Sequence, residues 1–146
     1  MKSDSFGFQK PEELISFPLY AASRELIRKY SALLDGIGLT YTQYLSMSLL
    51  WDRGVLTSKE MGDMLRLDSG TLTPLLKKLE AKGLTERRRL PRDERNLEIS
   101  ITDMGMELKD KAADIPGAVE STLNISKDDC IALRRILSRM ISFTES

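Results

Sequence analysis

Residues 67–83 read Leu-Asp-Ser-Gly-Thr-Leu-Thr-Pro-Leu-Leu-Lys-Lys-Leu-Glu-Ala-Lys-Gly, and this stretch decides the fold. Its leucines recur at positions i, i+3, i+4 and i+7, the spacing that puts side chains on one buried helical face. They are Leu72, Leu75, Leu76 and Leu79. Pro74 falls early in such a helix, where a missing amide donor is tolerated, and Gly83 ends it. The sequence therefore predicts a helix with one side in a core and the other in solvent.

The solvent face of this helix has short hydroxyl side chains near its start and cations beyond them. These residues are Ser69, Thr71, Thr73, Lys77 and Lys78. Short polar side chains at a helix N-terminus can approach base edges and phosphates closely, and the backbone amides there favour anions. Residues 85–95, Thr-Glu-Arg-Arg-Arg-Leu-Pro-Arg-Asp-Glu-Arg, follow as an arginine-dense hairpin. We interpret the two as a nucleic-acid recognition helix followed by a basic wing.

Charge is distributed unevenly along the chain. The 146 residues carry 22 basic and 22 acidic side chains, so the formal net charge is zero. Residues 77–95 alone hold eight basic and four acidic residues, a net charge of +4. Such a local patch releases counterions on contact with DNA even when the whole protein is neutral. The same residues, Arg87 and Arg88 among them, are also compatible with a solvated hairpin that binds no nucleic acid.

Periodicity and turn signals predict a mainly α fold with a small β-wing. Thr57 to Glu60 forms a capping box, after which Met61, Met64 and Leu65 are predicted to be buried. Leu97, Ile99 and Ile101 alternate with polar residues, as in a half-buried strand. The six predicted helices span about 11–35, 42–51, 57–65, 69–82, 103–114 and 127–143, and the wing pairs 84–90 with 97–102.

The whole chain, residues 1–146, is predicted to form one domain whose winged helix-turn-helix part spans about 42–102. The flanking helices, about 11–36 and 103–146, carry more apolar surface than one small winged domain covers. A second copy is the simplest partner for such faces, so we expect a homodimer, with packing inside one chain as the alternative. Residues 1–10, polar apart from Phe6 and Phe8, are expected to be a loose arm.

Composition disfavours several classes of protein. No apolar run approaches the roughly 18 residues of a membrane-spanning helix, and no signal peptide is recognisable, so we expect a cytoplasmic protein. Cys130 is the single cysteine and histidine is absent, which excludes an internal disulfide and disfavours a metal site. Because a histidine base, a nucleophile motif and a phosphate-binding glycine loop are all absent, we expect neither an enzyme nor a cofactor.

These motifs together resemble the MarR family of winged helix-turn-helix regulators. The resemblance covers nearly the whole chain, including the wing with Asp93-Glu-Arg95 and the following Ile101-Thr-Asp-Met-Gly105. Within the family the chain is most similar to the organic-hydroperoxide-sensing (OhrR-like) branch, with MgrA and SarZ as relatives. That similarity rests on Phe17-Pro-Leu-Tyr-Ala-Ala-Ser-Arg24 and Gly38-Leu-Thr-Tyr-Thr-Gln-Tyr-Leu45.

The resemblance implies a transcriptional regulator, and specifically a repressor, that binds a pseudo-palindromic operator as a homodimer. The helix at 69–82 would lie in the major groove, and Arg95 would enter the adjacent minor groove, positioned by Asp93. A narrow A·T-rich minor groove concentrates negative potential and attracts such an arginine. Two recognition helices related by a two-fold axis would meet half-sites about 34 Å apart.

One residue departs from the family pattern. In the peroxide-sensing branch a reactive cysteine precedes the Phe-x-Leu-Tyr motif, and this chain has Ser16 at that position. The tyrosines that the resemblance places around it are Tyr20, Tyr30 and Tyr41. Serine cannot be oxidised to the sulfenic and sulfinic acids that a cysteine forms, so peroxide sensing at Ser16 is chemically blocked.

Two accounts of Ser16 remain open. Either the chain is an engineered Cys→Ser form locked in a reduced, DNA-binding state, or it naturally lacks the sulfur and responds to another input. Pro18 favours the second account, because Ser16 would then be a good N-cap of the first helix. In that case a small aromatic or phenolic ligand would enter a cleft between the dimer helices and the winged part. The cleft would be lined by Tyr20, Tyr30, Tyr41 and Trp51, although these aromatics also suit an ordinary interface.

Two further alternatives concern Cys130 and the wing. Two-cysteine members of the branch carry a second cysteine near the position of Cys130, but here it has no first cysteine as a partner. We interpret it as a small apolar packing residue. The rival to DNA binding is a winged domain whose basic hairpin contacts an acidic protein. An affinity that falls steeply with salt and depends on duplex sequence would favour DNA.

Overall fold

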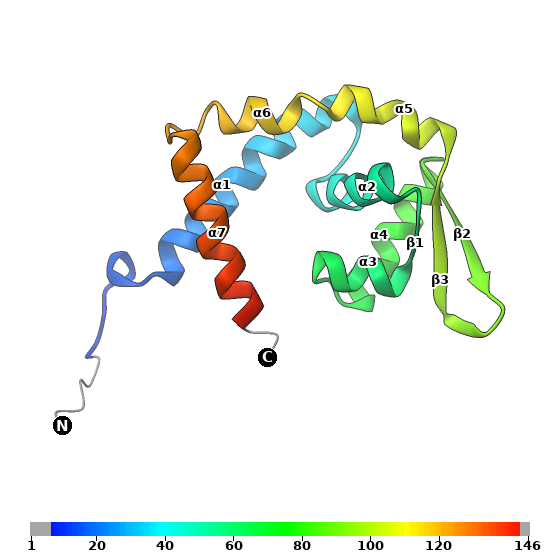
Figure 1. Ribbon diagram of the computed structural model, residues 1–146, viewed down its shortest axis with the longest axis horizontal. Coiled ribbons are helices and arrows are strands. Elements are labelled where there is room, and N and C mark those ends of the chain that lie inside the picture. Colours follow the sequence, from blue (N-terminus) through cyan, green and yellow to red (C-terminus); the bar gives the residue numbers. More distant parts are fainter. Residues whose placement is uncertain (1–6, 144–146) are drawn as a thin grey trace. The chain divides into compact units, whose positions relative to one another are not determined.

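The computed structural model describes residues 7–143, so residues 1–6 of the predicted arm, Phe6 included, lie outside the described residues. The chain divides into two compact units, Met1–Pro116 and Gly117–Ser146. Figure 1 labels the elements along the chain. In order they are η1 (Pro11–Glu13), α1 (Ser16–Leu34), η2 (Asp35–Ile37), α2 (Tyr41–Arg53), β1 (Val55–Thr57), α3 (Ser58–Leu65), α4 (Ser69–Ala81), β2 (Thr85–Leu90), β3 (Asp93–Ile101), α5 (Asp103–Ala112), α6 (Ile115–Glu120) and α7 (Lys127–Phe143), where η marks a single-turn 3₁₀ helix.

Side-chain caps fix where the central helices begin. Thr40 starts α2 and Thr57 starts α3, each through a reciprocal capping box with the residue three positions later. At the start of α4 the carboxylate of Asp68 accepts the backbone N–H of Thr71 at 2.8 Å. These three caps orient the helix-turn-helix segment that Figure 1 shows in cyan and green.

The predicted cap of α1 was wrong. Ile15, not Ser16, holds the N-cap position, and it makes no side-chain cap hydrogen bond. Its backbone is already helical, with φ −69° and ψ −30°, so the chain enters α1 without the extended residue that a serine cap needs. Ser16 is instead the first helical residue.

The core of the first unit lies between α2, α4 and the sheet. Met47 and Leu50 of α2 are fully buried. The four leucines that were predicted to be buried on α4 are each no more than 6% exposed. The prediction for α3 was correct for Met61, which is fully buried, but wrong for Met64, which is 45% exposed.

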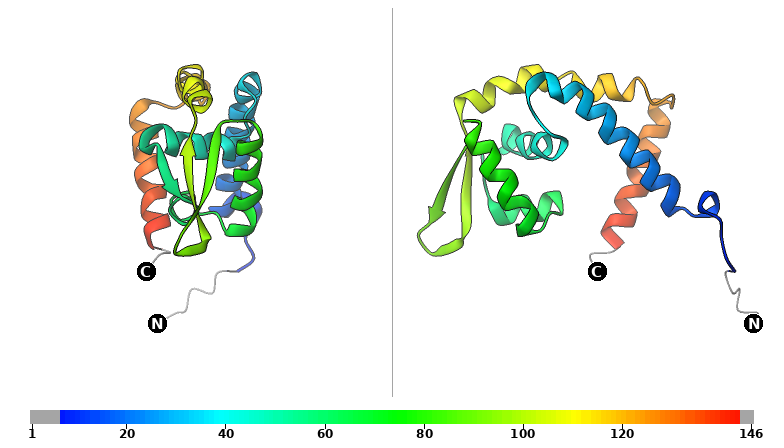
Figure 2. Two further views of the ribbon diagram at one scale, coloured as in Figure 1. Left: turned by 90° about the vertical axis from the view of Figure 1, so that its right-hand side faces the viewer. Right: turned by 180° about the vertical axis from the view of Figure 1, so that it is seen from behind.

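A three-stranded antiparallel sheet of order β1-β3-β2 flanks these helices. The wing pairing was predicted, with Arg87 opposite Ile99 and Arg88 opposite Glu98. β1 was not predicted; it places Leu56 opposite the fully buried Ile99. The β2–β3 hairpin lies to one side of α3 and α4, as the right-hand view in Figure 2 shows.

The remaining helices carry much apolar surface that is exposed in a single chain. Of the residues of α1, Leu34 is the buried one. The short helix α6 was not predicted, whereas α7 begins and ends where periodicity placed it. Within residues 7–143, no helix is long and apolar enough to cross a membrane.

Candidate nucleic-acid interface

The exposed face of α4 contains the residues that the sequence singled out. The leucines of α4 hold its opposite side in the core, so the polar residues point into solvent. Those exposed residues are Ser69, Thr71, Thr73, Lys77 and Lys78. The hydroxyl side chains lie in the first turns of the helix, beside backbone N–H groups that have no partner within the helix. The lysines lie in its last turns and carry positive charge on long side chains. This face can therefore approach a polyanion along its length.

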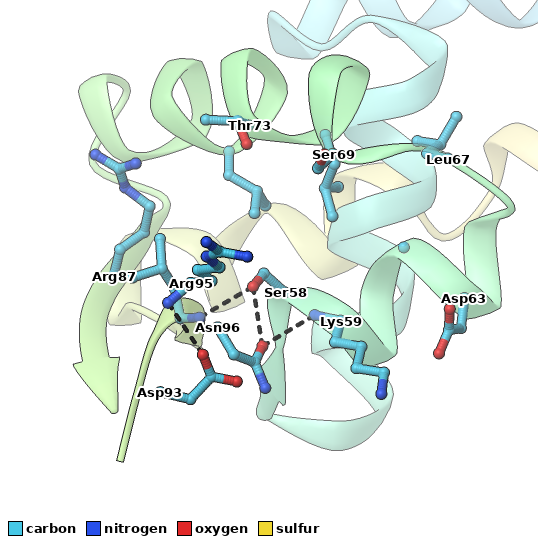
Figure 3. Close-up of a pocket in the computed structure, with 14 residues that line it drawn as sticks. Ser58, Lys59, Asp63, Leu67, Ser69, Thr73, Arg87, Asp93, Arg95 and Asn96 are labelled. Carbon is cyan, nitrogen blue, oxygen red and sulfur yellow. Dashed lines mark hydrogen bonds between the residues drawn. The ribbon is translucent and has the colours of Figure 1, made fainter. Parts of the chain in front are cut away.

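A groove of about 350 Å³ lies between α3, α4 and the wing (Figure 3). Ser69 and Thr73 line it from α4, Lys59 from α3, and Arg95 with Asn96 from β3. The lining thus combines hydroxyl, amide and cationic donors from α3, α4, β2 and β3 with the carboxylates of Asp63 and Asp93. Such donors suit the phosphate and sugar groups of a nucleic acid.

Hydrogen bonds join β3 to the start of α3, a few residues after the turn of the wing. Asn96 Oδ1 accepts the hydroxyl of Ser58 at 3.1 Å and the backbone N–H of Lys59 at 3.2 Å. The Ser58 hydroxyl oxygen accepts the backbone N–H of Leu97 at 3.0 Å. Figure 3 shows this network directly beside Arg95. Sequence reasoning missed Ser58 and Asn96, because the two residues are 38 positions apart in the sequence and only the fold brings them together.

Asp93 orders the turn of the wing through the backbone. Its Oδ1 accepts the backbone N–H of Arg95 at 3.1 Å. The contact fixes the main chain of Arg95 and leaves the Arg95 side chain exposed. The resemblance implied that Asp93 positions Arg95. In the structure Asp93 contacts the backbone of Arg95.

Two of the predicted basic residues of the wing are already engaged. Arg87 binds Glu80 of α4 with both sides of its guanidinium, at 3.1 Å from Nε to Oε2 and 3.1 Å from Nη2 to Oε1. These hydrogen bonds from Arg87 hold the pKa of Glu80 below its usual value. Arg88 pairs with Glu98 across the hairpin at 2.8 Å, with its side chain 77% exposed. Arg87 thus links the wing to α4, whereas Arg88 remains at the surface.

The predicted sensor residues do not come together in one chain. Tyr30 and Tyr41 lie with ring centroids 5.2 Å apart, and Tyr44, which the sequence reasoning missed, is 5.9 Å from Tyr30. Tyr20 is 57% exposed and instead packs against Arg24, whose Nη1 donates to its hydroxyl at 3.2 Å. Ser16 precedes Tyr30 by nearly four turns of one helix, roughly 20 Å of helical rise. A site that combined the two would need a second copy of the chain.

Burial affects the pKa of one tyrosine of this cluster, Tyr41. Desolvation raises the pKa of Tyr41 above its ordinary value, and the neighbouring Tyr44 raises it further. The Tyr41 phenol therefore stays neutral and available as a donor at physiological pH.

A second groove, of about 430 Å³, lies between α2 and α5. Trp51 forms one wall, packs edge-on against Tyr44 with centroids 6.1 Å apart, and donates its indole N–H to the carbonyl of Gly105 at 2.8 Å. Lys109 and Ala112 of α5 line the other side. The groove therefore offers an aromatic wall opposite a cation. Cys130, on α7 in the other unit, is a half-buried free thiol.

Comparison with known proteins places these features in context. A sequence model of the MarR family matches residues 39–97. The chain is 45% identical over 143 residues to the organic hydroperoxide resistance transcriptional regulator of Bacillus subtilis, covering 98% of this chain and 95% of that protein. It is 40% identical over 128 residues to the HTH-type transcriptional regulator SarZ of Staphylococcus aureus, covering 88% and 86% of the two chains. Reduced AbfR bound to DNA matches it with a TM-score of 0.77 and 30% identity, over 92% and 94% of the two chains.

Proposed function

This chain belongs to the MarR family of transcriptional regulators, and from that premise we propose that it is a repressor that binds a pseudo-palindromic operator as a homodimer. The resemblance found in the sequence, the winged-helix fold class and the role of regulator rather than enzyme are thereby confirmed. A protein that acts on chromosomal DNA works where that DNA is, so we propose a cytoplasmic location.

The observation that carries the proposal is the joint surface of α4 and the wing. Ser69 and Thr73 of α4 and the exposed Arg95 line one groove. The exposed Thr71, Lys77 and Lys78 extend the polar face of α4 beyond that groove. We assign α4 to the major groove and Arg95 to the adjacent minor groove, where negative potential is strongest over A·T-rich steps. Ser69, Thr71 and Thr73 would approach bases and sugars, while Lys77 and Lys78 would contact phosphates.

The homodimer is supported by apolar side chains that a single chain leaves exposed. On and before α1 these include Ile15 at 75% and Phe17 at 47% exposure; on α7 they include Ile131 at 60% and Ile136 at 48%. Several large apolar side chains exposed along one helix are typical of an interface between proteins. A two-fold pairing covers the same face on both copies and presents two α4 helices to one duplex.

The test is selection of duplexes from a randomised library with the purified chain, followed by fluorescence anisotropy of the enriched sequence. We expect a two-fold symmetric site bound at least about a thousand times more tightly than random duplex, with a steep loss of affinity in salt. Weak binding to every duplex alike would instead favour the alternative of a winged protein-interaction module.

For the signal, we propose that the chain as it stands does not release DNA in response to organic hydroperoxide. Ser16 has no sulfur to oxidise, although Tyr30 and Tyr41 form a cluster that a second copy would bring to it. The test adds an organic hydroperoxide to the DNA complexes of this chain and of Ser16→Cys. Release from the cysteine form alone would show a disabled oxidation switch; release from both forms would contradict the proposal.

A second candidate signal is a small planar aromatic acid, favoured by the groove between α2 and α5. Trp51 would stack on the ring and Lys109 would pair with the carboxylate. Titration with benzoate-class probes, followed by tryptophan fluorescence and DNA release, tests this role. The chain has one tryptophan, so its fluorescence reports this groove directly. Lys109→Met should abolish binding, and an unchanged dissociation constant would contradict it.

A further inference from the structure

One charged side chain joins the C-terminal end of α4 to the start of α2. The ammonium group of Lys82, the residue that caps α4, donates to the backbone carbonyl of Gly38 and, at 2.8 Å, to Oε1 of Gln43. Gln43 is only 4% exposed, and the same oxygen accepts the backbone N–H of Thr40 at 3.1 Å. Lys82 therefore completes the hydrogen bonding of a buried amide on another helix.

The partners of Lys82 lie where α1 ends and α2 begins. Gly38 closes the turn η2 directly after α1 in a left-handed conformation, with φ 73°, and Thr40 is the N-cap of α2. Tyr41 and Tyr44 occupy the first turn of α2 beside these contacts. Lys82 thus connects the junction of α1 and α2 to the end of α4.

Two-fold symmetry magnifies any change in this connection. In the proposed dimer α1 contributes to the interface between copies, and α4 meets the DNA. A tilt of α4 against α1 occurs in both copies, so the separation of the two recognition helices changes by twice the shift in one. One base pair is only about 3.4 Å of duplex, so a small tilt is enough to misalign a half-site.

We propose that Lys82 is a positioning residue for operator recognition, which sets the angle of α4 through Gln43 and Gly38 and does not bind phosphate. Its ammonium group is committed to two oxygens of the protein, whereas Lys77 and Lys78 point into solvent from the same helix. This assignment rests on the proposed function, because it concerns the spacing of two half-sites on DNA.

The DNA test compares the duplex selected by this chain with the same duplex lengthened by one base pair between the half-sites. We expect the unaltered chain to prefer the selected spacing by about tenfold or more, and Lys82→Met to lose most of that preference. Lys82→Arg, which keeps the cation, should restore it. The slope of log affinity against log salt should be unchanged in Lys82→Met, whereas Lys78→Met should lower it by about one with spacing preference intact.

A reduced salt slope for Lys82→Met with normal spacing preference would identify a phosphate contact and overturn the assignment. If the unaltered chain selects no duplex, the proposed function is wrong. Thermal unfolding without DNA then tests independently whether the Lys82 contact holds α4 against α2. Lys82→Met should lower the melting temperature by about 3 °C, with a smaller further loss in a Gln43→Met background, where only the contact with the Gly38 carbonyl remains. If the losses in melting temperature of the two substitutions add fully, or if Lys82→Met causes no loss, the Lys82 contact does not fix the position of α4.

Discussion

At the scale of single residues, Arg95 is the side chain whose removal tests the wing most directly. It is exposed, and its backbone is fixed by Asp93, so truncation removes a contact without disturbing the turn. Arg95→Ala should weaken operator binding by about 1–3 kcal/mol, measured by anisotropy on the selected duplex. Arg53→Ala is the matched control, because that arginine pairs with Asp52 on α2, away from the groove. If Arg95→Ala and Arg53→Ala bind the operator with equal affinity, the assignment of Arg95 to the minor groove is wrong.

Thr85 supplies a residue-scale test of the fold. It is 1% exposed, and among the described residues its hydroxyl has no hydrogen-bond partner. An unpaired buried hydroxyl costs free energy, so Thr85→Val should raise the free energy of unfolding by about 1 kcal/mol. Thr102→Val is the contrasting control, because its hydroxyl donates to Gly83 at 2.6 Å and accepts the N–H of Gly105. That variant should lose about 1–2 kcal/mol in denaturant unfolding.

The Glu80–Arg87 pair predicts an acid-sensitive contribution to stability. Because its folded-state pKa is lowered, Glu80 stabilises the fold at neutral pH and loses this effect as the pH falls below a free glutamate's pKa. Glu80→Gln should therefore lower the melting temperature at pH 7, and the difference from the unaltered chain should vanish in acid. Glu98→Gln, whose partner Arg88 is largely exposed, should change the melting temperature less. A difference for Glu80→Gln that does not vary with pH would contradict the pair's role.

The sequence predicted the exposure of single residues correctly where helical spacing alone determines it. It did not predict which side chains bind residues of other elements. Spacing placed the hydroxyls and lysines of α4 on one exposed face, as observed. A count of basic residues could not show that Lys82 and Arg87 bind other elements of the fold. Those contacts join residues 39 and 7 positions apart, and only the folded chain brings them together.

At the scale of elements, Gly105 controls how α5 meets the sheet. A Cβ on Gly105 would overlap the carbonyl oxygen of Leu84 and lie 2.8 Å from the Ile101 side chain. The backbone would have to move, and the indole hydrogen bond from Trp51 to the Gly105 carbonyl would move with it. Gly105→Ala should therefore destabilise the chain by about 2 kcal/mol or more in urea unfolding and shift the tryptophan fluorescence. Gly36→Ala is the control, because a Cβ there meets nothing within 4 Å.

The elements that periodicity missed are those too short or too irregular to show it. β1 has three residues, which is too few for alternation to register. α6 contains Pro116 and Gly117, a pair that ordinarily predicts a break. The long helices were predictable because each carries regularly spaced apolar residues, whether these lie in the core, as in α4, or are exposed in a single chain, as in α7.

At the scale of the whole molecule, each chain has more exposed apolar surface than a monomer tolerates well. The exposed residues on α7 include Leu133, Ile136 and Met140, each more than 40% exposed and spaced along one helical face. The face across the helix carries Ser138 and Ser142. A second copy that covered the apolar face would also set the distance between the two α4 helices. Assembly and DNA recognition should therefore fail together.

Ile136→Glu with Met140→Glu should convert a dimer of about 33 kDa into the 16.5 kDa chain, as measured by light scattering. Ser138→Glu with Ser142→Glu adds the same charge at the same spacing on the other face and should leave the dimer intact. Operator affinity should fall at least about a hundredfold for the first pair, because each monomer meets only one half-site. Removal of the residues after Lys127 is the harsher form of the experiment. If that truncated chain remained dimeric and still bound the operator, α7 would be dispensable and α1 alone would hold the two copies together.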